Sequence, residues 1–269
     1  MGKVVKEESK AVAIKEAASV PMESQLAAMM EEDSGVGFEN GTAADYAIPF
    51  LRVIQKGSPE CDEASPEYDE TMRPGMFQNS VTGKRYDGKK GVLFVPAMYL
   101  RVGTKWASNK ADGTGFRGQI SAADLDRVLL TCERDEKGHD ILPDGLMLVD
   151  NRQWFGLTLD DEEVSPVLFS LKATQIKKSK KWYAFANGLR HNGKPTPLYS
   201  QVYRITTVPE KNDQGGWMGV TITHEGTVPN VEVALEAKNF RGMILSGTAK
   251  PVEPDIEEST GAEPFNNQF

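Results

Sequence analysis

The chain has 269 residues, of which 39% are hydrophobic, and its 31 basic and 39 acidic residues give a net charge of -8. This length fits one domain of about 200 residues with tails. The composition excludes several classes: no apolar run approaches the roughly 20 residues of a membrane span, and the N-terminus is too polar for a secretory signal. Two cysteines and three histidines show neither a disulfide framework nor zinc-ligand spacing. We therefore expect a cytoplasmic protein without a metal, a cofactor or a membrane partner.

Residues 1–45 are predicted to form a flexible N-terminal arm, because lysines, glutamates and alanines mix there without a core-forming pattern. Short helices are expected within it at residues 11–18 and 22–30. The predicted core, residues 46–250, begins with the apolar run 46–54, which is predicted to be a strand or an edge segment, interrupted by Pro49.

The core is predicted to alternate short strands with a few helical segments. Turn dipeptides between residues 73 and 91 predict a meander of small strands. Longer strands are expected at 91–100, 127–132, 146–149, 154–159, 166–171, 198–208 and 217–224, the last two as a hairpin. Helices are expected at 121–126, with Ser121 and Asp124 as a capping box, and at 174–187 and 231–240. This pattern predicts an α+β fold dominated by β-structure.

The stretch from Ser165 to Val208 carries eight basic residues and no acid. Without it the chain would hold 23 basic and 39 acidic residues, a net charge of -16, so it is a cationic island in an acidic protein. Aromatic residues lie between the cations. Because lysine and arginine bind phosphates and flat rings stack on unpaired bases, this combination is typical of a single-stranded nucleic-acid site. The plain alternative is a solvated basic helix face.

Helical periodicity divides the expected helix 174–187 into two arcs. One arc holds Trp182 and Tyr183, which we interpret as core anchors, and the other holds the lysines together with Phe185. Thr174 is the expected N-cap and Gly188 the expected C′ residue. The candidate phosphate contacts are Lys177, Lys178, Lys180, Lys181, Arg190 and Lys194. The candidate stacking residues are Phe185 with either Tyr199 or Tyr203.

A second basic and aromatic stretch covers residues 101–119, with one acid, Asp112. It is predicted to extend the binding groove through Arg101, Lys105, Trp106 and Arg117.

The predicted C-terminal tail, residues 251–269, contains five acids and no base, and includes Phe265 and Phe269. An acidic solubilising tail is the ordinary interpretation. Rings contribute nothing to solubility, so we interpret Phe265 and Phe269 as partner-binding residues that dock into a basic pocket with an apolar floor. The tail could also fold back on the cationic stretch and compete with nucleic acid.

A basic, aromatic-rich β core followed by an acidic tail with a terminal phenylalanine resembles bacteriophage-type single-stranded DNA-binding proteins. The segments NSVTGKRYDGKKGVLFVPAMYLR (79–101) and SLKATQIKKSKKW (170–182) are similar to phage-encoded proteins of this kind. The resemblance implies an OB-like small barrel, or else an antiparallel sheet core with added helices, between flexible N- and C-terminal tails. It also implies DNA replication or recombination in the host cytoplasm, with recruitment of other phage enzymes through the tail. The oligomeric state stays open, a homo-oligomer included.

Enzyme motifs are missing from the sequence, since no GxSxG, HExxH or CxxC is present. We therefore expect a non-enzymatic protein. Two alternatives stay open. A phage structural or assembly protein could use the basic patch to meet packaged DNA or an acidic neighbour. A metal-dependent nuclease could use the ExK element Glu236-Ala-Lys238 with Asp144, Asp150 or Asp160.

Overall fold

The computed structural model describes residues 22–33, 36–37, 39, 47–107, 115–136, 138–160, 163–213 and 215–251. The chain divides into two compact units, Met1–Gly41 and Thr42–Phe269. The first unit contains helix α1 (Met22–Glu32), which confirms the helix expected at 22–30. Leu26, Met29 and Met30 are exposed on it. The helix expected at 11–18 and the tail beyond Pro251 lie outside the described residues.

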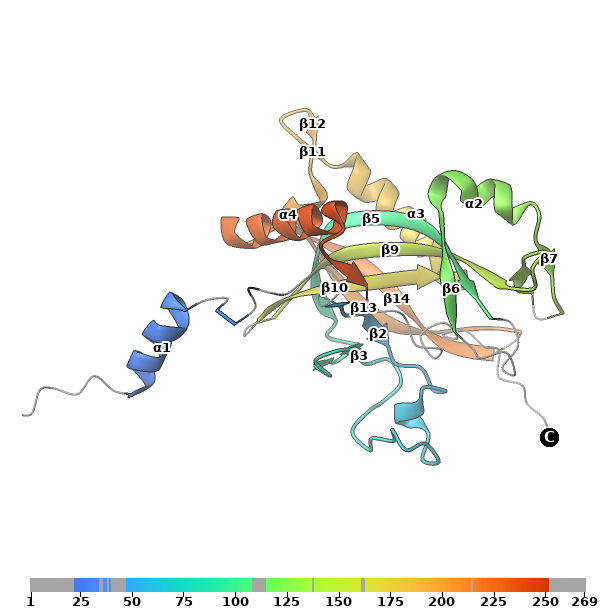
Figure 1. The fold of residues 1–269 in the computed structure, drawn as a ribbon, viewed down its shortest axis with the longest axis horizontal. Helices are drawn as coiled ribbons and strands as arrows, with labels where there is room; N and C mark the ends of the chain where they lie inside the picture. Colours follow the sequence, from blue (N-terminus) through green and yellow to red (C-terminus); the bar gives the residue numbers. More distant parts are fainter. Residues whose placement is uncertain are drawn as a thin grey trace, which may run out of the picture. The chain divides into compact units, whose positions relative to one another are not determined.

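The second unit is built on an eight-stranded antiparallel sheet. Its central pair is β5 (Val92–Trp106) and β9 (Met147–Leu159), which run side by side along their length. The remaining strands are β6 (Phe116–Ser121), β7 (Glu133–Arg134), β8 (Asp140–Ile141), β10 (Val164–Lys172), β13 (Gln201–Asn212) and β14 (Gly215–Thr227). Figure 1 shows this sheet curling into a half-barrel, which confirms the predicted α+β fold dominated by β-structure.

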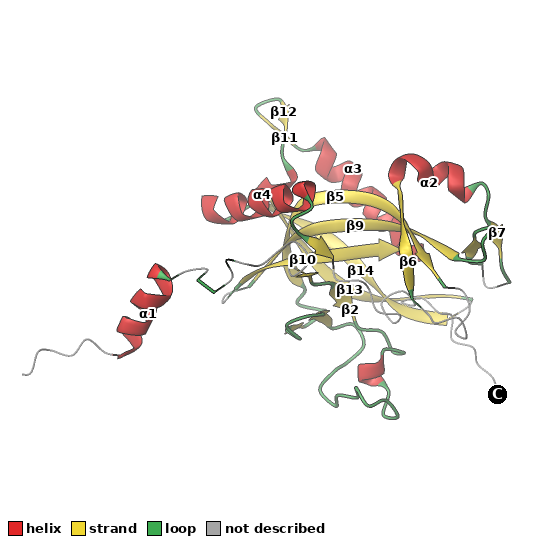
Figure 2. Ribbon diagram, viewed as in Figure 1, coloured by secondary structure: helices red, strands yellow, loops and turns green. Residues whose placement is uncertain are grey.

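Smaller sheets, a hairpin and helices lie around the half-barrel (Figure 2). A three-stranded sheet contains β2 (Leu51–Val53), β3 (Phe77–Asn79) and β4 (Arg85–Tyr86), and β1 (Ala47–Ile48) pairs in parallel with β15 (Lys250–Pro251). The hairpin β11 (Arg190–His191) and β12 (Lys194–Pro195) stands apart from the sheet. The helices are α2 (Ala122–Leu129), α3 (Ile176–Gly188) and α4 (Val231–Ser246), with single turns η1 (Pro59–Cys61), η3 (Ala173–Gln175) and η4 (Leu198–Ser200). None of the described helices is long and apolar enough to cross a membrane.

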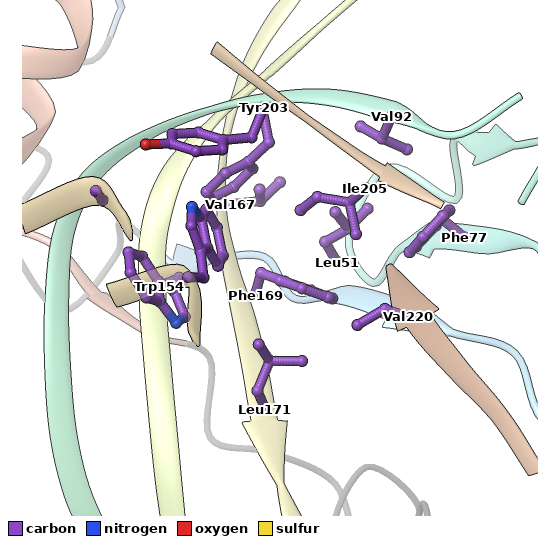
Figure 3. Close-up of a cluster of buried hydrophobic side chains, with 13 residues drawn as sticks. Leu51, Phe77, Val92, Trp154, Val167, Phe169, Leu171, Tyr203, Ile205 and Val220 are labelled. Atoms are coloured by element: carbon purple, nitrogen blue, oxygen red, sulfur yellow. The ribbon is translucent and has the colours of Figure 1, made fainter. Parts of the chain in front are cut away.

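Two hydrophobic cores lie on opposite faces of the sheet, because successive strand residues point to opposite sides. Phe94 and Trp154 belong to the inner core, together with Trp182 of α3 and residues of the three-stranded sheet. Figure 3 shows this cluster, with Trp154, Phe169 and Tyr203 among its members. Their neighbours Val95 and Phe155 belong to the other core, which α4 covers. Helices α3 and α4 therefore pack on opposite faces.

Helix α2 packs on the same face as α3, farther along β5 and β9. Leu148 lies an even number of residues from Trp154 on β9, and it forms a small core with Leu125 of α2. Gly103 of β5 permits the close approach, since a Cβ atom there would lie 2.5 Å from Leu125 Cδ1. The inner face of the central strands thus carries α3 at one end and α2 at the other.

Two predicted strand assignments are wrong. The segments 146–149 and 154–159 form the single strand β9, because the polar residues between them are neutralised by ion pairs on the inner face of the sheet. Residues 127–132 are not a strand but the end of α2 and the turn after it. In place of the predicted capping box, Ser121 Oγ donates to Asp124 Oδ2 at 3.0 Å, and Ser121 makes no cap bond to the backbone.

Strand β14 lies at an edge of the main sheet, paired with β13 on one side. Two glutamine side chains occupy part of its other side. Gln55 accepts the Met218 N–H at 2.8 Å and donates to the Met218 carbonyl at 3.0 Å. Gln175 accepts the Val220 N–H at 3.1 Å. These amides satisfy groups that would otherwise remain open to another strand.

Candidate nucleic-acid interface

Helix α3 is fixed to the sheet by a stack of two indoles. Trp182, 4% exposed, lies on Trp154 with ring centroids 3.8 Å apart and an interplanar angle of 14°. Trp154 Nε1 donates to Ser179 Oγ at 2.8 Å, so the first half of the helix is held by the same residue. The predicted helix and the role of Trp182 as a core anchor are confirmed. The anchor makes α3 a rigid support for the side chains on its outer face.

The predicted ends of this helix are wrong. The turn η3 leads directly into α3, so Gln175, not Thr174, precedes the first helical residue, and it makes no side-chain cap bond. Gly188 is the last helical residue and Leu189 the C-cap. The glutamine instead bonds to the backbone of β14, as described above.

The outer face of α3 carries Lys177, Lys180 and Lys181, and all three are exposed. None of them forms a salt bridge with another described residue. Like charges on neighbouring helical turns repel one another. A polyanion bound to this face would relieve that repulsion.

Lys178 differs from the other lysines because it is engaged within the protein. Its Nζ forms an ion pair with Glu210 of β13, which also accepts hydrogen bonds from Gln175 and from Trp217 Nε1 at 2.9 Å. Burial would raise the pKa of Glu210, but the hydrogen bonds from Lys178 and Gln175 outweigh it, and the pKa is lowered. Lys178 thus ties α3 to the β13–β14 hairpin and is the least available of the predicted phosphate contacts.

The aromatic candidates are placed differently from one another. Phe185 is 49% exposed, as predicted, and its ring lies 5.3 Å from that of His224 on β14. Tyr203 is 1% exposed and packs against Trp182, so it is part of the core. Tyr199 packs against the core beneath α4 and not against the residues around Phe185. Tyr183, predicted as a core anchor, is 46% exposed and lies over Tyr99, so that prediction is wrong.

The hairpin β11–β12 follows the C-terminal end of α3 (Figure 1). Asn192 and Gly193 at its tip both have positive φ, 49° and 76°, as two-residue hairpin turns require. Arg190 and Lys194 are exposed on its two strands. Arg190 Nη1 donates to the carbonyls of Asn187 and Leu189 at 2.6 and 3.0 Å, which fixes the guanidinium at the end of the helix. We call the set Lys177, Lys180, Lys181, Phe185, Arg190 and Lys194 the α3–hairpin surface.

The second predicted stretch does not form one surface. Trp106 is 5% exposed and donates from Nε1 to Thr104 Oγ1 at 3.1 Å, so its ring is buried. Arg117 is exposed on β6. Lys105 and Arg101 share the inner face of β5, because they lie four residues apart on one strand. Of these residues, Arg101 is the one that the structure connects to α3.

That connection is a cluster of charges between α2 and α3. Arg101 donates to both oxygens of Asp150, at 3.2 and 3.0 Å, and its Nη2 lies 2.7 Å from Asp126 Oδ1 of α2. Arg152 donates to Asp150 Oδ2 at 2.9 Å. The pKa of Asp126 is lowered, first by the hydrogen bond from Arg101 and also by the charges of Arg152 and Lys180. Lys180 of the α3–hairpin surface therefore lies within electrostatic reach of this cluster.

Sequence reasoning missed Arg152 because residues 150–153 (DNRQ) were taken to separate two predicted strands. Had the segment been read as strand, Asp150 and Arg152 would have fallen on the same face as Trp154. The alternation of Asp150, Arg152 and Trp154 at every second position was the signal in the sequence that could have indicated a strand.

The described residues offer no support for a metal centre. They contain no group of three or more His, Cys, Asp or Glu side chains that could hold a metal ion. Of the carboxylates considered for a nuclease, Asp150 is bound by two arginines and Asp160 by Lys84. Glu236 lies on α4, on the opposite side of the sheet from Asp150.

A protein-family model matches residues 15–250 and is described as Pam3 phage gp34-like protein. The chain belongs to this family. The match covers most of the sequence, including every strand of the main sheet and helices α2 to α4, and it confirms the expected phage association. No curated protein and no solved structure shows a significant match. The family description names no ligand or activity, so single-stranded DNA binding stays a prediction.

Proposed function

We propose that this member of the Pam3 phage gp34-like family binds single-stranded DNA without sequence preference and without catalysing a reaction. The observation that carries the proposal is the α3–hairpin surface. It brings five cations and a half-exposed phenyl ring together on one helix and the hairpin after it. Its role would be to coat exposed strands during phage replication or recombination in the host cytoplasm.

The arrangement suits a sequence-tolerant ligand. Lysine and arginine contacts to phosphates carry no base information, and every base has a flat face that can stack on Phe185. The indole stack beneath α3 holds the helix in place before DNA binds. Binding of the strand therefore costs little conformational entropy.

The same arrangement favours single strands over duplex. A ring that projects from a helix can stack only on a base whose face is free, and the bases of a duplex already stack on one another. Phe185 is 49% exposed and its ring lies against His224 on one side, which leaves the remainder of the ring for a base.

The acidic C-terminal tail completes the proposal. Phe265 and Phe269 would bind a basic pocket with an apolar floor on a replication or recombination protein. These residues lie outside the described part of the chain, and the proposal for them is based on composition alone. It does not depend on the α3–hairpin surface.

The proposal is tested by fluorescence anisotropy of a labelled oligo-dT, with unlabelled duplex as competitor, at two salt concentrations. We expect salt-sensitive binding that duplex does not compete away. The variant Lys177→Glu/Lys181→Glu removes two phosphate contacts and should reduce the slope of log affinity against log salt by about 1.4, that is about 0.7 per contact.

The matched control is Lys238→Glu/Arg241→Glu. It makes the same change in net charge, but on α4, across the sheet from α3. It should alter binding far less than the α3 variant. If both variants bind like the parent, the α3–hairpin surface is not the site.

The alternatives predict other results. A structural or assembly protein would fail to bind oligo-dT at low salt and would form stable high-order assemblies. A nuclease would shorten the oligonucleotide when magnesium or manganese is added.

A further inference from the structure

Within five residues of β5, the inner face of the strand contacts first α3 and then α2. Tyr99 contacts Tyr183 of α3, with ring centroids 4.9 Å apart, and Gly103 lies under Leu125 of α2. Arg101 is midway between them on the same face of the strand. It therefore lies at the junction of the two helices, beside the α3–hairpin surface.

The junction holds two arginines directly opposite each other. Arg101 pairs in register with Arg152 of β9, and like charges in such a position repel. Asp150 lies between them and accepts hydrogen bonds from both. Asp150 alone cannot neutralise two guanidinium groups, so Asp126 supplies the second negative charge, and Lys180 nearby adds a further positive charge.

The second carboxylate, Asp126, is bound in a different way from Asp150. The Asp150 side chain is 18% exposed and accepts three hydrogen bonds from the two arginines. The Asp126 side chain is 76% exposed and is held by Arg101 Nη2 at 2.7 Å. Exposed ion pairs of this kind contribute little to stability, so Asp126 can leave the arginine at small cost.

The cluster also has hydrogen-bonding capacity left over. Arg152 is 6% exposed, and its Nε is buried with no hydrogen-bond partner in the described part of the chain. A buried guanidinium N–H without a partner is unusual in a folded protein.

We propose that the position of the Asp126 carboxylate above Arg101 is a phosphate-binding subsite, and that Asp126 occupies it until a phosphate of the DNA backbone takes its place. This inference rests on the proposed function and extends its site from the α3–hairpin surface to Arg101 and Arg152. The exchange replaces one anion by another, so the charge balance around the two arginines is kept. Arginine suits the role because its planar donors match phosphate oxygens.

The proposal makes Asp126 an internal competitor of DNA. Its removal should therefore strengthen binding, whereas a purely structural ion pair would only affect stability. The test is Asp126→Asn, which keeps the shape of the side chain and removes its charge. The matched control is Asp124→Asn, which removes one negative charge from the same helix, where Asp124 pairs with Arg127 instead of Arg101.

In the oligo-dT assay, Asp126→Asn should tighten binding at low salt by about three- to tenfold and steepen the salt dependence by about 0.7, the value for one further phosphate contact. Asp124→Asn should bind like the parent. Adding Arg101→Gln to Asp126→Asn should abolish the gain. Equal tightening by both aspartate variants would indicate a general charge effect and overturn the proposal, as would no change in either.

A second measurement separates this subsite from the proposed function. If the parent does not bind oligo-dT, the proposed function fails, and thermal unfolding with inorganic tripolyphosphate then decides the subsite. Tripolyphosphate should raise the melting temperature of Asp126→Asn more than that of Asp124→Asn, and the added Arg101→Gln should remove the difference. Equal shifts in all variants would refute the subsite.

Discussion

The substitution Ser179→Ala tests how α3 is anchored. Ser179 and Trp154 are both 0% exposed, and the Ser179 hydroxyl accepts the indole N–H of Trp154 at 2.8 Å. Alanine removes one oxygen and leaves the helix, the indole stack and the surface lysines in place. The change therefore isolates a single buried hydrogen bond beneath the proposed binding surface.

The expected cost follows from the orphaned donor. A buried N–H that loses its partner pays its full desolvation penalty, about 1–3 kcal/mol. For a unit of this size, each kcal/mol lowers the melting temperature by about 2–4 °C. We therefore expect Ser179→Ala to melt about 2–12 °C below the parent. The affinity for oligo-dT measured well below the melting temperature should stay within about twofold, since no phosphate or base contact is removed.

The assay is urea unfolding followed by tryptophan fluorescence, together with a thermal melt. Ser246→Ala is the matched control, because this exposed hydroxyl at the end of α4 donates to the carbonyl of Met243 in its own helix. The control should change stability by less than about 0.5 kcal/mol. If Ser179→Ala is equally neutral, the indole N–H is not confined as described, and the rigid support argued for α3 is refuted.

Three further results are expected. Phe185→Ala should weaken oligo-dT binding by about 1–3 kcal/mol with little loss of stability, and anisotropy showing unchanged affinity would exclude Phe185 as a stacking residue. Burial raises the pKa of Tyr203 to about 12 in the folded protein, against about 10 in the unfolded chain. The buried neutral hydroxyl therefore contributes its full stabilisation below pH about 10, and this contribution is lost as the pH rises towards the pKa of the folded state. Urea unfolding at intervals across that range should show a smaller alkaline decline for Tyr203→Phe than for the parent; equal declines would contradict this assignment. Deleting residues 252–269, which keeps the β15 pairing of Pro251 with Ile48, should leave oligo-dT affinity unchanged or increase it, and weaker binding would rule out a competing tail.

The sequence was most informative where periodicity and composition agreed. The helix around Trp182 was predicted to within two residues at its start and one at its end, because a tryptophan, a serine and an alanine at helical spacing face the core while lysines face solvent. The β13–β14 hairpin was predicted because two apolar runs flank a polar loop. In both cases local pattern and tertiary burial require the same conformation.

The failures came from contacts between segments far apart in the chain. Asp150 and Arg152 looked like residues of a break between two strands, yet they lie in one strand, where Arg101 pairs with Arg152 in register and binds Asp150. Tyr203 looked available for stacking, but the curl of the sheet encloses it under Trp182. Lys178 was grouped with the neighbouring lysines as a phosphate contact, but in the structure it forms an ion pair with Glu210 of β13. One-dimensional patterns do not contain these pairings.

The glutamine amides on β14 have a consequence for how the protein behaves when many copies are close together, as they would be along a coated strand. An open sheet edge is a template on which another chain can add a strand, and this leads to aggregation. Many proteins protect such an edge with charged side chains. Gln55 and Gln175 instead present peptide-like groups to Met218 and Val220, so neutral amides protect this part of the edge. Under the proposed function, copies bound side by side on a strand would be kept from pairing their sheets at this part of β14.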